Sequence, residues 1–228
     1  MFRHELKYLC NEQQIAVLKS RLQGLMKIDS HTVDGEYSIR SLYFDSYANT
    51  CYYENENGTN PREKFRLRIY NSDSSRISLE CKRKEKEKTY KTTCLITKNQ
   101  YNEIIQGGSL EDIDQKPNLL RKFTLLLKTQ LYHPTVIVEY DRIPFIYEIG
   151  NVRVTFDLNI RSASAYNDFF SSDLHTRPIL PRGQHLIEIK YDELIPDFIK
   201  KTLQTEDLFR NSFSKYYLCR KYSLGGIL

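Results

Sequence analysis

Charged and apolar residues alternate along residues 61–94, and this pattern constrains the fold more than any other feature of the sequence. In the first half, Lys64, Arg66 and Arg68 are separated by single apolar residues, and Lys82 holds an equivalent position in the second half. Successive side chains of a β-strand point to opposite faces of a sheet. This period of two therefore predicts strands with one basic face and one apolar face.

The polar residues 71–75 separate the two halves and predict the loop of a β-hairpin. A third alternating run, residues 86–95, carries Lys91, and Glu80 is the single carboxylate on the face that the three strands would share. Such a face is most often solvated, but solvated faces usually mix charge signs because adjacent like charges repel. The planar guanidinium groups of Arg66 and Arg68 suit bidentate contacts with phosphate oxygens, so the pattern favours a face that surrounds a polyanion.

The size and charge of the chain agree with a single domain that binds an anion at one place. The 228 residues suffice for a sizeable core, and neither a repeat nor a shift in composition marks a boundary, so one domain over residues 1–228 is expected. The 34 Lys and Arg against 29 Asp and Glu give a net charge of +5. Because this excess is modest and clustered, nucleic acid is not expected as a partner.

Cysteine usage and the N-terminal segment indicate a reducing, cytoplasmic setting. Five scattered cysteines show neither a C-x-x-C motif nor the spacing of zinc ligands. Met1 leads directly into a charged segment, so no signal peptide is expected, and no apolar run approaches the ~20 residues that a membrane helix needs. If the protein works at a membrane, a membrane partner protein must hold it there.

The remaining patterns predict strands and helices in one mixed domain. Further strands are expected at residues 2–9, 36–46, 135–147, 151–160 and 184–191, and helices after Asn11 and at 47–57, 98–106, 118–131, 195–203 and 213–224. Asn11 and Gln14 match a capping box, whereas Pro144 would interrupt pairing and predicts an edge strand or a bulge. About eight strands with interspersed helices predict an α+β fold: an eight-stranded antiparallel β-barrel, closed or nearly closed, with flanking helices.

Because alternate residues of a strand share a face, charged residues of both signs are expected together on one face of this barrel. They are Glu5, Lys7, Arg66, Arg68, Glu80, Lys82, Lys91, Arg142, Arg153, Asp157, Glu188 and Lys190. A barrel lined with charges is costly unless water, metal or ligand fills it. Cations bind phosphates, and carboxylates bind a divalent metal that bridges phosphate oxygens. Phosphoryl transfer requires this combination of positioning and charge stabilisation, with little need for a protein nucleophile.

Each of these signals is weak alone, and the prediction rests on their joint occurrence. A single Glu-x-Lys is a common exposed pair on a strand, and Arg-x-Arg is similarly unspecific. A run of charges such as residues 82–88 most often forms the solvated end of a hairpin, and this interpretation is adopted for Arg83, Lys84, Lys86 and Lys88. The histidines form no catalytic pattern, and no glycine-rich phosphate loop occurs.

Nine short motifs, in order, make the chain resemble a known family over nearly its whole length, from Arg3 to Cys219. The motifs are HELKY, SLYFD, KFRLR, LECKRK, TYKTT, VEYDRIPF, RVTFD, IEIKY and FSKYYLC. They resemble the polyphosphate polymerase domain of vacuolar transporter chaperone (VTC) proteins, a member of the triphosphate tunnel metalloenzymes. The resemblance implies an eight-stranded antiparallel tunnel, closed at one end by helices, with its basic residues pointing inward.

The same motifs imply roles for individual residues. Catalytic cations that hold phosphates along the tunnel would be Arg66, Arg68, Lys82, Lys91, Arg142 and Arg153. Further substrate-binding residues would be Lys7, Tyr140, Lys190, Ser214 and Lys215. The resemblance gives Glu188 as a carboxylate for Mn²⁺ or Mg²⁺, with Glu5 and Glu80 as further metal candidates.

The reaction that this resemblance implies is transfer of the γ-phosphoryl group of ATP to a growing polyphosphate chain. The main alternative is hydrolysis of triphosphate or polyphosphate, as in tunnel relatives that carry a Glu-x-Glu-x-Lys first strand. Here Arg3 stands where the outer glutamate would lie, which favours the cation-rich polymerase type. A second alternative is a module that binds polyanions without catalysis.

Overall fold

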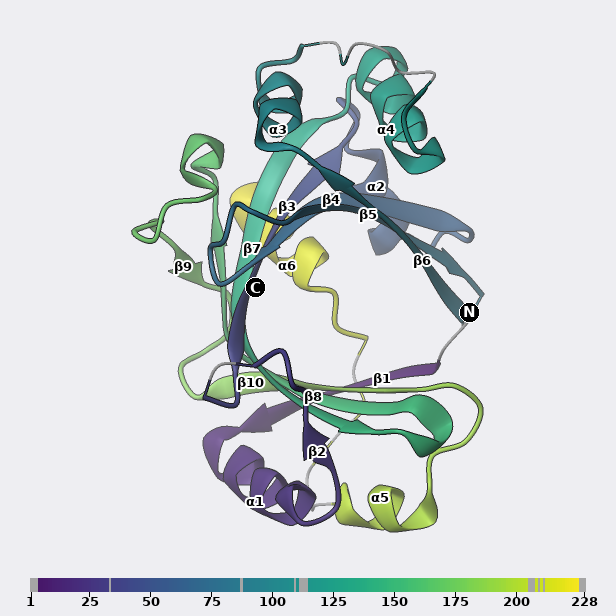
Figure 1. Ribbon diagram of the computed structural model, residues 1–228, viewed down its shortest axis with the longest axis vertical. Coiled ribbons are helices and arrows are strands. Elements are labelled where there is room, and N and C mark those ends of the chain that lie inside the picture. Colours follow the sequence, from purple (N-terminus) through teal and green to yellow (C-terminus); the bar gives the residue numbers. More distant parts are fainter. Residues whose placement is uncertain are drawn as a thin grey trace.

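A single antiparallel sheet curls around the C-terminal helix α6 (Lys215–Ser223) and forms the centre of the fold (Figure 1). The computed structural model describes residues 4–32, 34–86, 88–108, 110, 115–204, 208, 210 and 212–225. The main strands follow the order β1-β10-β8-β7-β3-β4-β5-β6, and the short β2 and β9 pair with β7 and β8. Their bounds are β1 (His4–Asn11), β2 (Lys27–Ile28), β3 (Tyr37–Asp45), β4 (Arg62–Tyr70), β5 (Ile77–Glu85), β6 (Lys88–Ile96), β7 (His133–Tyr147), β8 (Val152–Ala163), β9 (Arg177–Pro178) and β10 (Gln184–Tyr191).

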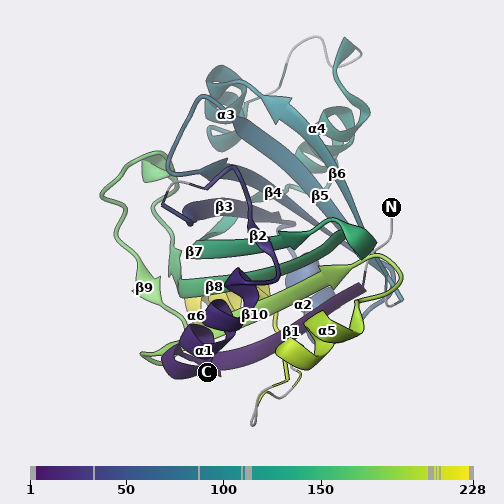
Figure 2. The ribbon, with the colours of Figure 1, turned by 60° about the horizontal axis from the view of Figure 1, so that its bottom comes forward.

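This arrangement confirms the predicted α+β fold with eight antiparallel strands and flanking helices. The sheet is a strongly curled half-barrel, because the described residues contain no hydrogen-bonded ladder between β1 and β6 at its two ends. Figure 1 looks through the curl, with β6 and β1 on either side of the open edge. In Figure 2, β7, β8, β10 and β1 lie side by side.

Helices cover the sheet on both faces. Outside the curl, α1 (Glu12–Gln23) and α5 (Asp197–Thr202) pack against β8 and β10, while α3 (Lys98–Ile105) and α4 (Asn118–Thr129) lie over β4 and β5 (Figure 1). Inside the curl are α6 and α2 (Thr50–Glu56). Short 3₁₀ turns occur at Ile149–Asn151 and Tyr166–Asp168. All six expected helices form at or close to their predicted positions.

Local sequence explains where the first helix begins. The Asn11 side chain accepts a hydrogen bond from the Gln14 backbone N–H at 2.8 Å, and the Gln14 side chain accepts one from the Asn11 backbone N–H at 2.9 Å. This is the predicted capping box, which satisfies two amides that the helix leaves unpaired. Leu18 and Leu22, one turn apart, are fully buried against the outer face of the sheet.

The period-two pattern of β4 and β5 sorts side chains as predicted. Phe65 and Leu67 are fully buried on the outer face, where the Phe65 ring stacks on Phe123 of α4 with ring centres 5.5 Å apart. The alternating residues Arg66 and Arg68 therefore point into the curl. The apolar face stabilises the sheet, and it leaves the inner face free to carry charge.

The structure corrects the interpretation of Pro144. β7 pairs with both β3 and β8, so it is an interior strand and not an edge. Pro144 is tolerated because its pairing with β3 ends at Arg142, and the carbonyl of Pro144 accepts a hydrogen bond from the Asp29 N–H at 3.1 Å. The missing N–H of proline thus falls where one neighbouring strand is replaced by another.

A bulge also corrects the expected inner face of β8. Strict alternation along residues 151–160 predicts that Asn159 lies on the same side as Arg153, Thr155 and Asp157, but it has a positive φ of 51° and is exposed. The register shifts at this point, with two residues of β8 opposite one residue of β7. Such a bulge shifts the parity of every later residue, so Ile160 faces the inner core instead.

Candidate functional site

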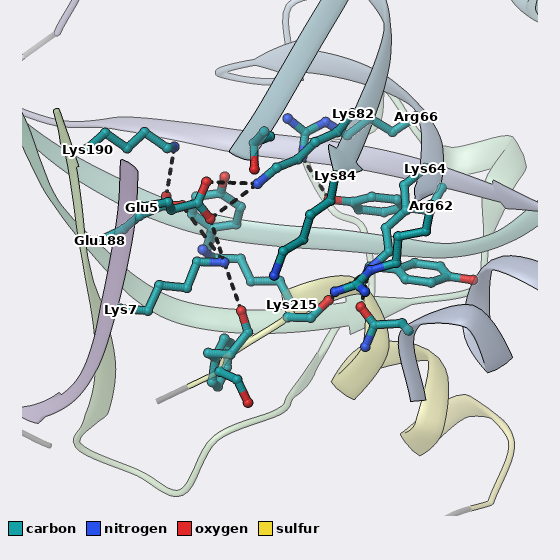
Figure 3. Close-up of a pocket in the computed structure, with 18 of the residues that line it drawn as sticks. Glu5, Lys7, Arg62, Lys64, Arg66, Lys82, Lys84, Glu188, Lys190 and Lys215 are labelled. Atoms are coloured by element: carbon teal, nitrogen blue, oxygen red, sulfur yellow. Dashed lines mark hydrogen bonds and ion pairs between the residues drawn. The ribbon is translucent and has the colours of Figure 1, made fainter. Parts of the chain in front are cut away.

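A cavity of about 750 Å³ lies between the inner face of the sheet and the helices α2 and α6 (Figure 3). Eleven cationic residues line it: Lys7, Arg62, Lys64, Arg66, Arg68, Lys82, Lys84, Arg142, Lys190, Arg210 and Lys215. Among the described lining residues, the carboxylates are Glu5, Glu56 and Glu188. A cavity with this excess of positive charge is suited to an anion with several negative groups.

Two glutamates form an acidic end of the cavity on β1 and β10. Lys7 lies 2.8 Å from Glu5 and 3.9 Å from Glu188, and Lys190 lies 3.1 Å from Glu188. Lys82 reaches Glu5 from β5 at 2.9 Å. Figure 3 shows these side chains together at one end of the view, with Arg62, Lys64 and Lys84 toward the other.

The surrounding lysines keep both glutamates ionised. Burial and the neighbouring Glu188 raise the pKa of Glu5, but Lys82, Lys7 and Lys190 outweigh them, so its pKa is lowered overall. Glu188 is also buried, yet Lys190 and Lys7 hold its pKa well below the ordinary value. Burial lowers the pKa of Lys7, but Glu5 and Glu188 more than compensate and raise it. The acidic end is therefore a set of charged groups at neutral pH.

A second charged cluster, formed by Arg142, Asp157 and Lys215, lies beside Tyr140. Arg142 donates to both carboxylate oxygens of Asp157 at 2.6 and 2.8 Å, and Lys215 approaches Asp157 at 2.5 Å. Arg142 and Lys215 also lie over the Tyr140 ring, 5.2 and 4.7 Å from its centre. Arg68 reaches the Tyr140 hydroxyl at 3.4 Å. Asp157 is fully buried, and it orients two cations that face the cavity.

Arg66 is held in place from behind by Glu80. Its guanidinium donates to Glu80 at 2.7 Å and to the Tyr43 hydroxyl at 2.8 Å. Lys91 contacts Glu80 from β6 at 3.2 Å, and Glu80 is almost wholly buried. Burial raises the pKa of Glu80, but Arg66, Arg68 and Lys91 lower it strongly. Glu80 thus acts as a fixed counter-ion to the cationic wall.

Helix α6 is anchored by a buried aspartate. The Tyr216 hydroxyl donates to Asp45 at 2.6 Å, and Asp45 also accepts the backbone N–H groups of Ser46, Cys51 and Tyr52 at 2.8, 2.8 and 3.1 Å. This contact fixes the first turn of α6. Because Ser214 and Lys215 lie in the same turn, it also fixes their position in the cavity wall.

Of the three glutamates that were metal candidates from the sequence, two fit a divalent metal and one does not. Mg²⁺ and Mn²⁺ sites in phosphate-handling proteins need one or two carboxylates, with phosphate oxygens and water completing the shell. Glu5 and Glu188 face the cavity on adjacent strands and fit this need. Glu80 does not fit, because it lies behind Arg66 and outside the lining. No group of three or more His, Cys, Asp or Glu suited to a metal occurs within the described ranges.

Most residues predicted from the sequence line this cavity. They are Glu5, Lys7, Arg66, Arg68, Lys82, Tyr140, Arg142, Glu188, Lys190, Ser214 and Lys215. Three others do not line it. Glu80 lies behind Arg66, on the side away from the cavity. The Lys91 side chain is 52% exposed at the edge of the sheet, and Arg153 forms an ion pair with Asp29. Arg3 lies outside the described residues.

Sequence reasoning also missed residues of the lining. Lys84 was interpreted as part of a solvated hairpin end, but its side chain reaches the cavity (Figure 3). Lys64 was placed on the basic face and given no role, and Arg62 precedes it by two residues on the same face. The alternation of β4 therefore already indicated that Arg62 and Lys64 share a face with Arg66. Asn55 and Arg210 come from α2 and from the segment before α6, and no strand pattern could have located them.

Comparisons with known proteins identify the architecture. A model of the VTC domain family matches residues 2–224. HpAC1 from Hippeastrum, a candidate adenylyl cyclase described as having a dominant triphosphatase activity, has a similar structure: TM-score 0.58, 14% identity, 100% of this chain and 98% of that chain covered. A candidate adenylate cyclase from Vibrio parahaemolyticus aligns with TM-score 0.51, 13% identity and coverage of 96% and 97%. One from Bacillus halodurans aligns with TM-score 0.50, 14% identity and coverage of 90% and 88%.

Two further findings concern sequence relatives and membrane-spanning helices. No curated protein sequence matches the chain significantly. Among the residues that the structure describes, none of the helices has the length and apolar character needed to cross a membrane.

Proposed function

Since the chain belongs to the VTC domain family, we propose that it is a polyphosphate polymerase. It would transfer the γ-phosphoryl group of ATP to a growing inorganic polyphosphate chain inside the basic cavity. The observation that carries this proposal is the convergence of eleven cationic residues on one cavity that has two glutamates at one end. A linear polyanion can reach cationic residues along the whole cavity, whereas a small anion would contact only a few of them.

The cations would position and stabilise the phosphates. Arg66 and Arg68 present planar guanidinium donors from one strand, and Arg142 and Lys215 present further cationic groups from the side of Tyr140. In phosphoryl transfer the negative charge is spread over the transferred group, so fixed cations that need no reorganisation lower the barrier. Glu80 and Asp157 hold the arginines before substrate binds, which is the preorganisation that such catalysis requires.

Glu5 and Glu188 would hold a divalent metal, Mn²⁺ or Mg²⁺, at the acidic end. When bound, such a metal supplies Lewis-acid stabilisation of charge on phosphate oxygens. Lys7 and Lys190 are ion-paired to these glutamates here, and because both line the cavity they would contact phosphate oxygens once the glutamates hold the metal. The acceptor of the phosphoryl group is itself a phosphate, so the nucleophile comes from the substrate.

Hydrolysis of triphosphate is the second candidate function, and the triphosphatase activity described for HpAC1 favours it. The same cavity would then direct water to the terminal phosphate. One assay separates the two reactions. Purified protein with Mn²⁺ and ATP should release ADP and build a phosphate polymer visible on a gel. Orthophosphate without polymer would indicate a hydrolase, and neither product would indicate a module that only binds polyanions.

The cellular setting is part of the proposal. All five cysteines are free thiols, which agrees with a reducing compartment, so we place the reaction in the cytoplasm. Transfer of the product across a membrane would then require a separate membrane protein as partner.

A further inference from the structure

Lys64 differs from four other lysines of the cavity in the partners that it has. Its ammonium group donates to Asn55 Oδ1 at 2.5 Å and to Ser214 Oγ at 3.2 Å, and it lies 5.0 Å from the centre of the Tyr216 ring. All of these partners are neutral. Lys7, Lys82, Lys190 and Lys215 each contact a carboxylate, and Lys64 contacts none within the described part of the chain.

The surroundings of Lys64 are mostly cationic. Arg62, Lys82, Lys7, Cys51 and Glu54 interact with it electrostatically, and its ammonium group lies over the Tyr216 ring. Arg66, Lys84 and Glu56 line the same cavity. Burial lowers the pKa of Lys64 first, and Arg62, Lys82 and Lys7 lower it further, to about 7. Without ligand, much of this residue is therefore neutral at physiological pH.

We propose that Lys64 is a further substrate-binding residue, which contacts a phosphate group away from Glu5 and Glu188 and is protonated when the polyanion binds. This inference rests on the proposed function, because it assumes that a chain of phosphates occupies the cavity. An ammonium group has three N–H donors. Asn55 and Ser214 take two of them, so one is left for the ligand.

Polyanion binding supplies the charge that the site lacks. A phosphate oxygen beside Lys64 favours the ammonium form and offsets the repulsion from Arg62 and Lys82. The proton comes from solvent, so binding near pH 8 consumes protons at this residue. At pH 6 Lys64 is already charged, and binding changes nothing there. The cavity would thus bind polyphosphate more tightly as pH falls through neutrality.

Calorimetry of inorganic tripolyphosphate binding tests this inference directly. Titrations at pH 8 and pH 6, in buffers of different ionisation enthalpy, give the number of protons taken up per ligand. The comparison uses wild type and Lys64→Arg, which stays charged at both pH values. We expect wild type to take up roughly half a proton or more beyond Lys64→Arg at pH 8, and no excess at pH 6. The titration of the ligand itself cancels in this difference.

Two further variants complete the test. Lys64→Met should bind tripolyphosphate roughly 10- to 100-fold more weakly at pH 6, whereas Lys128→Met, an exposed lysine of α4, should bind as wild type does. Equal proton uptake by wild type and Lys64→Arg at pH 8 would overturn the inference and leave the proposed function standing. Absence of tripolyphosphate binding by wild type would overturn both. If Lys64→Met does not fold, the wild-type and Lys64→Arg titrations decide alone.

Discussion

Lys82 of β5 donates to both carboxylate oxygens of Glu5 on β1, at 3.2 and 2.9 Å. These strands lie near opposite ends of the sheet, since β1 is one edge strand and β5 adjoins the other, β6. Side chains therefore connect the two sides of the open edge, where the described residues show no backbone ladder. The same ion pair therefore helps to hold the sheet in its curled shape and fixes one glutamate of the acidic end.

This relationship predicts an energetic coupling between the two residues. The variants Glu5→Gln and Lys82→Met should each lower the free energy of unfolding, and the double variant should cost less than their sum, with a coupling of about 1 kcal/mol. Urea denaturation of the four proteins measures it. The exposed pair Lys27 and Glu148, with side chains 82% and 84% exposed, is the matched control and should show almost no coupling. Strict additivity for Glu5 and Lys82 would contradict the link.

Removal of a cation or a metal carboxylate should stop turnover without unfolding the protein. Arg66→Ala and Glu188→Ala should each lower kcat by about 100-fold or more, because both side chains line the cavity in which the proposed phosphoryl transfer would take place. Thermal melting should still be cooperative. Arg83→Ala is the control, since Arg83 pairs with Glu63 and Glu85 outside the cavity and should keep full activity. Normal turnover in both cavity variants would refute the site.

Metal binding should distinguish Glu188 from Glu80, both of which were metal candidates from the sequence. Glu188→Gln should weaken Mn²⁺ binding in the presence of tripolyphosphate, because Glu188 faces the cavity beside Glu5. Glu80→Gln should leave metal affinity unchanged, since Glu80 lies behind Arg66 and outside the cavity lining. Electron paramagnetic resonance of Mn²⁺ gives both affinities. A larger loss for Glu80→Gln would place the metal on the opposite wall.

Asp157 should make stability depend on pH in acid. Burial raises its pKa, but Arg142 and Lys215 outweigh burial and lower it below its ordinary value of 3.8. A lowered pKa means that the stabilisation is complete above the unfolded-state value and is lost as pH falls through the folded-state value. Asp157→Asn should cost about 3–5 kcal/mol at pH 7 and flatten the loss of stability below pH 4. An unchanged acid profile would show that another group controls it.

The anchor of α6 predicts a difference between two adjacent tyrosines. Tyr216→Phe removes the buried hydrogen bond to Asp45 and should cost about 1.5–3 kcal/mol, the range for bonds to charged groups. Its KM should rise, because Ser214 and Lys215 would lose their fixed position. Tyr217→Phe removes an exposed bond to Glu56 and should change neither quantity much. Equal effects of both substitutions would count against the anchor.

Strand alternation explains why so much of the cavity could be predicted from sequence. A period of two fixes which side chains share a face, so Arg66, Arg68 and Lys82 were placed together correctly. The same rule says nothing about how far along the strand a cavity extends. Arg153 has the expected parity, but it lies at the end of β8, where Asp29 after β2 binds it.

Other parts of the site could not be predicted because they depend on contacts between distant segments. Glu80 and Asp157 appear in the sequence as carboxylates on the basic face. Only the structure shows that each accepts hydrogen bonds from an arginine, Glu80 from Arg66 and Asp157 from Arg142. The unusual environment of Lys64 arises from α2 and α6, which no strand pattern places. Asn159 was misplaced because a bulge changes parity without any signal in the alternation.

The pairing of β1 with β10 has a consequence for how the protein is made. Their partner residues, such as Glu5 and Lys190, are separated by most of the chain. Contacts between such remote segments form slowly, because a long loop must close first. During synthesis β1 cannot pair until β10 has left the ribosome. Glu5 and Glu188 therefore come together only after the residues between them have been translated, and the proposed metal site cannot form before then.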